Sequence, residues 1–493
     1  MIPIFSSLNM MQRALQVTQS AIQTTGHNIS NANTDGFSRQ RVNLTTWLPY
    51  PGTGINAARG AGQIGTGVND EAVVRIRDQF VDLQVRDNGN QNGYWSALSD
   101  AYSQMEDIMN EPTDSGLSTG LDGFWQSLQD LASNSGTSGT GTVVLQKGAA
   151  VADTFNYLAV SLGKVQDNLN QQITENVGLI NNYADQINAL NQQINKQEAN
   201  GFLANDLYDE RDLLTDKLAQ LANIKVSKVK SDGNPSPLAE GRYTIELADA
   251  NGNTLGTLVN GETLTDSTLN ASITNADSSQ PHVTVALDGD AVDGFAGKLQ
   301  GLIDAYTKDY PSVLQSLDNM ASKLADAFNA VYEQTAGYDS GKGTFFLGTN
   351  DGTETGAFTA KTIHVNEALS GTDITAANAG QPSGDNSGAQ ALADVIATNT
   401  YTIDPDGESV TLKSYLQSLV GQIGVNAQSA NQFTSNTQTM LDAAQNRRSS
   451  ISGVSLDEEL TNLIQFQHSY GAAAKVVTTL DTLLDTLINK MGG

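Results

Sequence analysis

The sequence predicts a mainly α-helical protein that carries a β-rich insertion. Apolar residues recur at heptad spacing at both ends of the chain, and three internal regions also have helical periodicity. Residues 225–294 instead contain short alternating runs separated by Asp-Gly and Asn-Gly pairs, which are typical of β-hairpins. We therefore expect a terminal-helix coiled-coil inner domain, an elongated helical second domain and an outer β-rich domain.

The first helix is expected at the N-terminus and should end in a turn. Its apolar residues follow one another in steps of four, three and seven, as in a coiled coil. This stripe consists of Ile4, Leu8, Met11, Leu15, Ile22 and Ile29. Residues 28–36 are rich in Asn and Gly and predict a turn, in which Gly36 is a natural site for a positive φ.

A longer heptad stripe lies at the C-terminus. Ser455 followed by Glu458 is typical of a capping box at the start of its helix. The stripe consists of Leu463, Phe466, Tyr470, Ala473, Val477, Leu480, Leu484, Leu487 and Met491. Either terminal stripe alone would leave a large apolar surface in water. We expect the two ends to pair with each other, or with neighbouring subunits.

The remaining chain predicts a domain order of helix, body, β insertion, body and helix. Helical periodicity covers residues 153–224, with a break at Gly201, and also residues 297–335 and 411–448. We expect two discontinuous helical parts: an inner coiled-coil domain (1–41 plus 451–493) and a mainly helical rod domain (42–224 plus 295–343 plus 410–450). We also expect a β-rich outer insertion (225–294) and an irregular, β-rich segment packed on the rod domain (344–409).

Composition and charge exclude several classes of function. A net charge of −28 argues against binding to nucleic acid, and no polybasic run is present to attract a membrane. Cysteine is absent, which excludes disulfides and thiolate chemistry. The four histidines are scattered over unrelated segments without ligand spacing. We therefore expect no catalytic residues, no cofactor and no metal site, and we predict that the protein is not an enzyme.

Two terminal segments resemble the flagellar rod, hook and hook-associated proteins. Residues 28–40, with the sequence NISNANTDGFSRQ, resemble the N-terminal signature of that family. Residues 452–459, continuing into residues 463–470, are similar to its C-terminal motif. Residues 205–212, with the sequence NDLYDERD, are similar to a pattern of the members that join the hook to the filament.

The resemblance implies a structural axial protein that forms the hook–filament junction by packing through its terminal helices. Its implied partners are further copies of itself in a ring, the hook protein, the next hook-associated protein on the filament side, and an export chaperone at the C-terminal helix. It also implies export to the outside of the cell by the flagellar type III apparatus, which agrees with an N-terminus that lacks the features of a signal peptide. A hook or other axial subunit, or a surface-exposed binding module on such a scaffold, is the alternative.

The residues expected to act in assembly fall into three sets. Subunit packing is assigned to Leu8, Met11, Leu15, Ile22, Leu463, Phe466, Tyr470, Val477, Leu480, Leu484 and Leu487. The turn of the N-terminal motif is assigned to Asn31, Asn33, Gly36 and Phe37. Ion pairs between subunits are expected from Arg39 and Arg41, or from Arg447 and Arg448, to Asp457, Glu458 and Glu459.

Overall fold

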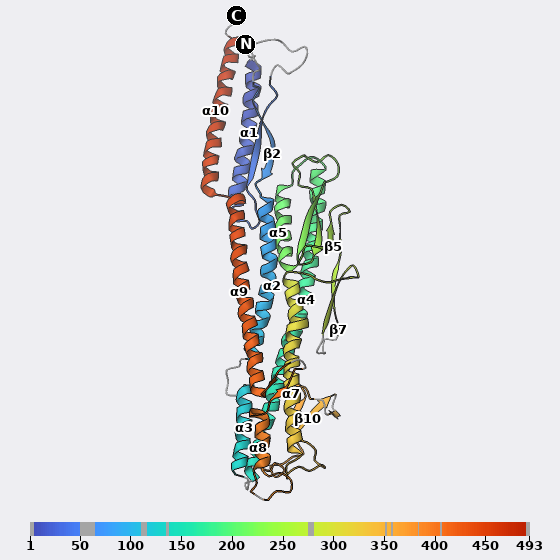
Figure 1. Ribbon diagram of the computed structural model, residues 1–493. Coiled ribbons are helices and arrows are strands. Elements are labelled where there is room, and N and C mark those ends of the chain that lie inside the picture. Colours follow the sequence, from blue (N-terminus) through green and yellow to red (C-terminus); the bar gives the residue numbers. More distant parts are fainter. Residues whose placement is uncertain are drawn as a thin grey trace. The chain divides into compact units, whose positions relative to one another are not determined.

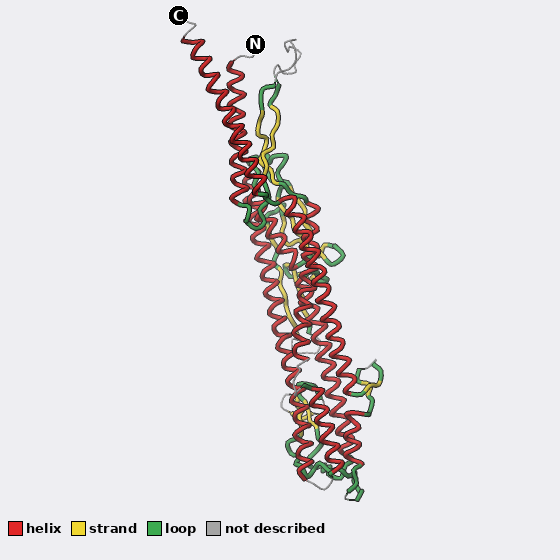
Figure 2. Tube along the Cα trace, turned by 90° about the vertical axis from the view of Figure 1, so that its left-hand side faces the viewer, coloured by secondary structure: helices red, strands yellow, loops and turns green. Residues whose placement is uncertain are grey.

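The computed structural model describes residues 4–49, 65–109, 116–134, 138–274, 281–350, 353–355, 358–382, 384–404 and 407–489. Helices make up most of these residues, and the strands form short antiparallel sheets (Figure 2). The predicted mainly α class with β insertions is therefore confirmed. Within the described ranges, no helix combines the length and the apolar character that crossing a membrane requires.

The chain folds as two compact units. The first comprises residues 1–90, 180–268 and 438–493, and the second comprises residues 91–179 and 269–437. Three helices contribute residues to both units. They are α2 (Gln79–Met109), α4 (Ser138–Glu198) and α9 (Leu412–Ser452). The division into four parts expected from the sequence is finer than these two units, and it stays a prediction.

In the first unit the two ends of the chain form a helix pair. Helices α1 (Ile4–Ser30) and α10 (Leu456–Asn489) lie side by side (Figure 1), which confirms the expected pairing within one chain. Helix α1 also packs against a hairpin of β1 (Gln40–Thr46) and β2 (Val68–Arg75), whose register begins at Gln40 opposite Arg75. The sequence had not predicted this hairpin.

The β-rich segment consists of two separate sheets. In the first unit, a four-stranded sheet has the order β3-β4-β5-β6, formed by Ile224–Val229, Arg242–Ala248, Thr254–Asn260 and Thr265–Asp266. In the second unit, a three-stranded sheet has the order β7-β8-β9, formed by Leu269–Thr274, His282–Leu287 and Asp290–Val292. Helix α5 (Asn205–Leu221) precedes the first sheet and is separated from α4 by Gly201, whose φ is +84°.

The second unit has an aromatic core. Phe124, Phe328, Phe345 and Phe346 are fully buried, and their ring centroids are 4.7 to 6.2 Å apart. Helices α3 (Leu117–Ser133), α7 (Tyr310–Tyr332) and α8 (Ser387–Ala397) pack at this core. Helix α6 (Lys298–Asp304) and the π-helical turn η1 (Ala305–Asp309) directly precede α7 in the chain. The short strands are β10 (Phe346–Asn350), β11 (Thr353–Thr355), β12 (Ile363–Val365), β13 (Tyr401–Thr402) and β14 (Ser409–Val410).

Helix α8 was not predicted from the sequence, which indicated an irregular, β-rich segment there. Its apolar residues Ala389, Leu392, Ala393 and Ile396 have helical spacing, but the segment has only 11 residues, a length at which periodicity alone separates helix from strand poorly. In the structure its buried side chains pack against α3 and α7. Tertiary contacts therefore decide its conformation.

Three buried asparagines join helices to strands by the same pair of hydrogen bonds. In each case the Asn Nδ2 donates to a strand carbonyl oxygen at 2.9 Å, and the amide nitrogen of the same strand residue donates to Asn Oδ1 at 2.9 to 3.0 Å. The pairs are Asn28 with Gln40, Asn191 with Tyr243, and Asn329 with Phe346. An uncharged side chain thus satisfies both backbone groups of a buried strand residue.

We expect Asn329→Ala to lower the free energy of unfolding by about 1–3 kcal/mol for each of the two Phe346 backbone groups that it leaves without a partner. Denaturant titration followed by circular dichroism would measure the loss. Asn168→Ala, at an exposed position of α4, is the matched control and should change stability little. Equal midpoints for the two variants would contradict this role of Asn329.

Candidate functional site

Three segments that the sequence singled out come together in the first unit. They are residues 28–40, residues 205–216 and residues 452–459, and with Arg75, Arg77 and Arg86 they form what we name the motif cluster. Asn28, which is 1% exposed, donates from Nδ2 both to the Gln40 carbonyl oxygen at 2.9 Å and to Glu459 Oε2 at 3.1 Å. The motif at the N-terminal end of the chain is thus bonded directly to the motif at the other end.

Arg39 makes a second link between the two terminal motifs. Its Nε donates to Glu459 Oε1 at 2.7 Å, and its Nη1 donates to Glu458 Oε2 at 3.0 Å. Its backbone nitrogen donates to the Ser452 carbonyl oxygen at 2.8 Å. Arg39, Glu458 and Glu459 therefore have ion-pair partners inside one chain. Ion pairs between subunits stay a prediction, for which Arg41 and Asp457 remain exposed.

The turn of the N-terminal motif ends α1 and leads into β1. Asn31 Nδ2 donates to the His27 carbonyl oxygen at 3.1 Å, which satisfies an acceptor at the helix end. Gly36 has the expected positive φ, +79°. Phe37 packs edge-on against the His27 ring, with centroids 5.4 Å apart. Asn33 is exposed and lines the cavity described below.

Three aspartates of α5 form the acidic part of a buried ion-pair network. Asp209, Asp212 and Asp216 are three and four residues apart, so they lie on one face of the helix. Two arginines at the end of β2 and just beyond it approach this face. Arg75 Nη1 lies 2.6 Å from Asp209 Oδ1 and 3.0 Å from Asp212 Oδ2. Arg77 Nη1 lies 3.0 Å from the same Asp212 oxygen.

Two further arginines extend the network to other helices. Arg86 of α2 donates from Nε to Asp216 Oδ1 at 2.8 Å, and its Nη2 lies 3.4 Å from Asp212 Oδ1. Arg448 of α9 pairs with the other oxygen of Asp216. The network thereby joins α5 to β2, α2 and α9.

The pKa values of two neighbouring aspartates shift in opposite directions. Burial alone would raise the pKa of the Asp212 carboxyl, but the charges of Arg77 and Arg75 hold this pKa well below its usual range. Burial raises the pKa of Asp209, because its pairing with Arg75 does not offset the loss of water. Asp212 is therefore the anion that the arginines stabilise most.

Arg211 connects the network to the four-stranded sheet. Its Nη1 donates to the Gly241 carbonyl oxygen at 2.7 Å, and its guanidinium carbon lies 3.4 Å from the centroid of the Tyr243 ring. The Tyr243 hydroxyl in turn donates to Asp212 Oδ1 at 2.8 Å. A buried cation is thus stabilised by a carbonyl and by an aromatic face.

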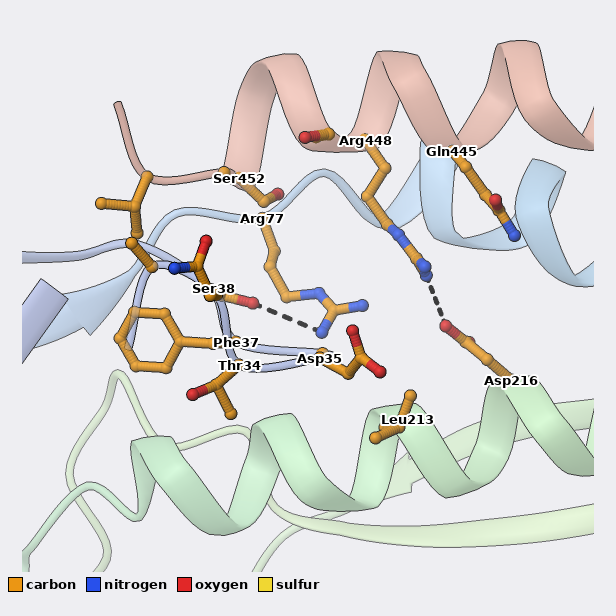
Figure 3. A pocket seen from close by; sticks show the side chains of 16 residues that line it. Thr34, Asp35, Phe37, Ser38, Arg77, Leu213, Asp216, Gln445, Arg448 and Ser452 are labelled. Carbon is orange, nitrogen blue, oxygen red and sulfur yellow. Dashed lines mark hydrogen bonds and ion pairs between the residues drawn. The ribbon is translucent and has the colours of Figure 1, made fainter. Parts of the chain in front are cut away.

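A cavity of about 310 Å³ opens at the motif cluster, between the turn at residues 32–38 and the end of α9. Figure 3 shows Asp35, Arg77, Arg448 and Asp216 around it, with the Arg448–Asp216 ion pair marked. The lining contains neither histidine nor cysteine. Among the described residues, no group of three or more His, Cys, Asp or Glu side chains is arranged to hold a metal ion.

The residues expected to pack subunits together are only partly covered in the single chain. Leu8, Met11, Leu15 and Ile22 of α1 are half-buried, as are Leu463, Phe466, Val477, Leu480 and Leu484 of α10. Tyr470 is 40% exposed, and the side chain of Leu487 lies outside the described residues. The most buried face of α1 is a different one, formed by Val17, Ala21, Thr25 and Asn28.

Sequence reasoning missed the arginine–aspartate network, although it had noted residues 205–212 for their resemblance. The helical spacing of Asp209, Asp212 and Asp216 could have indicated a charged face. Nothing in the sequence indicates that this face is buried, because its partners Arg75 and Arg86 lie more than a hundred residues away.

We expect Asp212→Asn to destabilise the protein by about 3–5 kcal/mol at neutral pH, since it leaves buried arginines without their shared anion. The pKa of Asp212 is lower in the folded than in the unfolded chain, so its contribution is complete above about pH 4 and falls as the pH drops further. Thermal unfolding at neutral pH and at about pH 2 should show that the gap between wild type and variant narrows in acid.

Asp209→Asn is the matched comparison for Asp212→Asn. Because the pKa of Asp209 is raised in the folded chain, loss of its charge should cost less than loss of the Asp212 charge. A larger loss of stability for Asp209→Asn would contradict the assignment of Asp212 as the central anion.

We expect Gly36→Ala to destabilise the first unit by about 1–3 kcal/mol, because its φ of +79° is strained for a residue with a Cβ. The added Cβ would also lie 3.0 Å from Leu213 Cβ. Gly26→Ala, in open space on α1, is the control and should be neutral or stabilising. Unchanged thermal unfolding of Gly36→Ala would show that the turn tolerates other residues.

Comparisons with known proteins agree with this arrangement. Residues 102–346 match the family described as the flagellar hook-associated protein FlgK helical domain, and residues 445–490 match the flagellar basal body rod FlgEFG protein C-terminal family. Flagellar hook-associated protein 1 of Bacillus subtilis is 42% identical over 99% of this chain and 98% of its own length. The protein of the same name from Salmonella typhimurium is 28% identical over 98% of this chain and 99% of its own.

A solved structure shares the fold. The flagellar hook junction protein FlgK from Burkholderia pseudomallei superposes with a TM-score of 0.60 over 75% of this chain and all of that chain, at 15% identity. Both family matches, and the identity over nearly the whole length, point to the same group of proteins. The chain therefore belongs to the flagellar hook-associated protein 1 family, a family of structural flagellar proteins and not of enzymes.

Proposed function

We propose that this chain joins the hook to the filament by packing α1 and α10 against the same helices of neighbouring copies. The observation that carries the proposal is the apolar surface of α10. Although α1 already packs along it, α10 exposes five large apolar side chains, each 44 to 55% exposed. They are Leu456, Leu460, Ile464, Val476 and Leu483. An apolar surface of this kind on a structural protein favours contacts with other subunits.

The half-buried stripes would add to this contact. Burial of each Leu or Phe side chain in an interface is worth on the order of 1.5–3 kcal/mol. Several such residues on each subunit, repeated around a ring-like homo-oligomer, would give a joint that resists torque. The predicted packing residues of α1 and α10 and the five exposed residues of α10 together would form this interface.

The motif cluster would transmit load from the helix pair to the rest of the first unit. Asn28 of α1 donates to the Gln40 carbonyl oxygen of the hairpin, and Arg39 donates to Glu459 of α10. Asp209 of α5 accepts a hydrogen bond from the backbone nitrogen of Ser38 at 3.0 Å. The buried ion pairs of α5 then connect this point to α2 and α9. A force applied to the terminal helices would therefore act on a base that is held by buried ion pairs.

The remaining partners follow from the family and from the exposed helix. The hook protein would bind on one side of the ring, and the next hook-associated protein would bind on the filament side. Before assembly, the exposed apolar face of α10 would need a cover, which a dedicated export chaperone would provide. Export by the flagellar type III apparatus, without a cleaved signal peptide, would deliver the protein to the outside of the cell.

Electron microscopy of cells in which the protein lacks residues 456–493 tests the proposed function. We expect complete hooks without filaments, with filament subunits shed into the medium. Missing hooks would instead indicate a rod or hook subunit, and normal flagella would contradict a role for α10.

A point variant separates assembly from folding. Leu460→Glu combined with Ile464→Glu places charge on the exposed face of α10, so we expect normal unfolding of the purified protein but loss of filaments in cells. Gln467→Glu, at an exposed polar position of the same helix, is the control and should assemble. Normal motility of the double variant would contradict the proposed interface.

A further inference from the structure

A groove in the second unit is not used by the packing proposed above. Its volume is about 380 Å³, and it is lined by α2, by the α6–η1 segment and by α9. The residues that determine its chemistry are Tyr94, Trp95, Tyr102, Asp304, Asp309 and Phe433. Because this groove lies in the second unit, a test of it does not depend on the terminal helices.

One wall of the groove is an aromatic platform. Trp95 of α2 stacks on Phe433 of α9, with ring centroids 4.4 Å apart and an angle of 23° between the planes. Phe433 is 47% exposed, although it is a large apolar residue. Tyr94 meets Trp95 edge-on at 5.1 Å. The faces of such rings carry negative electrostatic potential and attract cations.

Two carboxylates at the ends of the π-helical turn also line the groove. Asp304 accepts hydrogen bonds from Tyr94 at 3.2 Å and from Lys308 at 2.6 Å. Asp309 accepts a hydrogen bond from Tyr102, and among the described residues it forms no ion pair. Burial raises the pKa of Asp309, and the hydrogen bond from Tyr102 and the charge of Lys308 offset this rise only in part.

The π-helical turn explains why these two carboxylates share one groove. Asp304 and Asp309 are five residues apart, and in an α-helix this spacing would turn them well away from each other. The wider π-helical turn brings residues five apart closer to the same side. Such turns are rare and frequently lie at functional sites.

We propose that this groove binds the guanidinium group of an arginine side chain on a partner protein. A planar guanidinium can stack on the Trp95–Phe433 platform while its N–H groups reach Asp309. A lysine ammonium group is more strongly hydrated and cannot stack in this way. A second copy of this chain fits less well, since most of its described arginines already pair with carboxylates of their own chain, as Arg39 and Arg86 do.

Trp95 provides the readout for a test in the full-length protein. Replacing the other two of its three tryptophans, Trp47→Phe and Trp125→Phe, leaves Trp95 as the sole tryptophan reporter. The probe is an alanine-rich peptide with one arginine, compared with the same peptide carrying neutral citrulline. At constant ionic strength we expect a saturable change in Trp95 fluorescence on addition of peptide. The affinity for the arginine peptide should be about tenfold higher than the affinity for the citrulline peptide.

Variants of each wall identify the groove as the site. Asp309→Asn should lower the affinity for the arginine peptide at least severalfold without loss of stability, because this carboxylate is already disfavoured by burial. Phe433→Leu removes one of the two rings of the platform, so it should weaken binding even though Asp309 is kept. Asp167→Asn, at an exposed position of α4 in the same unit, is the matched control and should bind as the parent does.

Two outcomes would overturn the proposal. Equal affinity for the arginine and citrulline peptides would show that the cation is not recognised. Trp95 fluorescence could instead change when the protein concentration is raised without any peptide. If Asp309→Asn abolished that change, a second copy would occupy the groove in place of another protein.

Discussion

Asp212 is the charge on which the arrangement of the first unit depends. Its carboxylate is nearly inaccessible to water and lies within ion-pair distance of Arg75, Arg77 and Arg86, which are far from Asp212 in the sequence. Removing such charges from water is costly unless every one of them is paired. The elements that carry these groups therefore have few alternative arrangements. Helix α5, the end of β2 and the start of α2 are held in one geometry, and Arg448 attaches the end of α9 to it.

The same constraint acts on uncharged groups throughout the molecule. Only 16% of residues are charged, and side-chain amides make several of the buried polar contacts. Asn28, Asn191 and Asn329 each satisfy both backbone groups of one strand residue, so a helix can pack against a strand without burying unpaired donors or acceptors. The amide-rich composition thus has a structural use, because it joins helices to small sheets without additional charge.

The two family matches cover different parts of the chain. The match shared with rod proteins covers residues 445–490, which include the whole of α10 and its exposed apolar side chains. The hook-associated match covers residues 102–346, which include the aromatic core residues Phe124 and Phe328 and the π-helical turn. The terminal helix would thus serve the packing that axial proteins have in common. The carboxylates of the aromatic groove lie in the other segment, whereas its platform residues Trp95 and Phe433 lie outside both matches.

The sequence alone predicted the helices at both ends, the break at Gly201 and the positive φ of Gly36, and it left open whether the terminal helices pair within one chain or between subunits. Heptad spacing and glycine stereochemistry are local properties, and a linear sequence displays them directly. Only the tertiary structure decided that Asp209 and Asp212 are buried, that residues 225–294 form two sheets, and that residues 387–397 are helical. Burial, ion pairing and the conformation of short apolar runs depend on partners that are distant in the chain, and only folding brings those partners together.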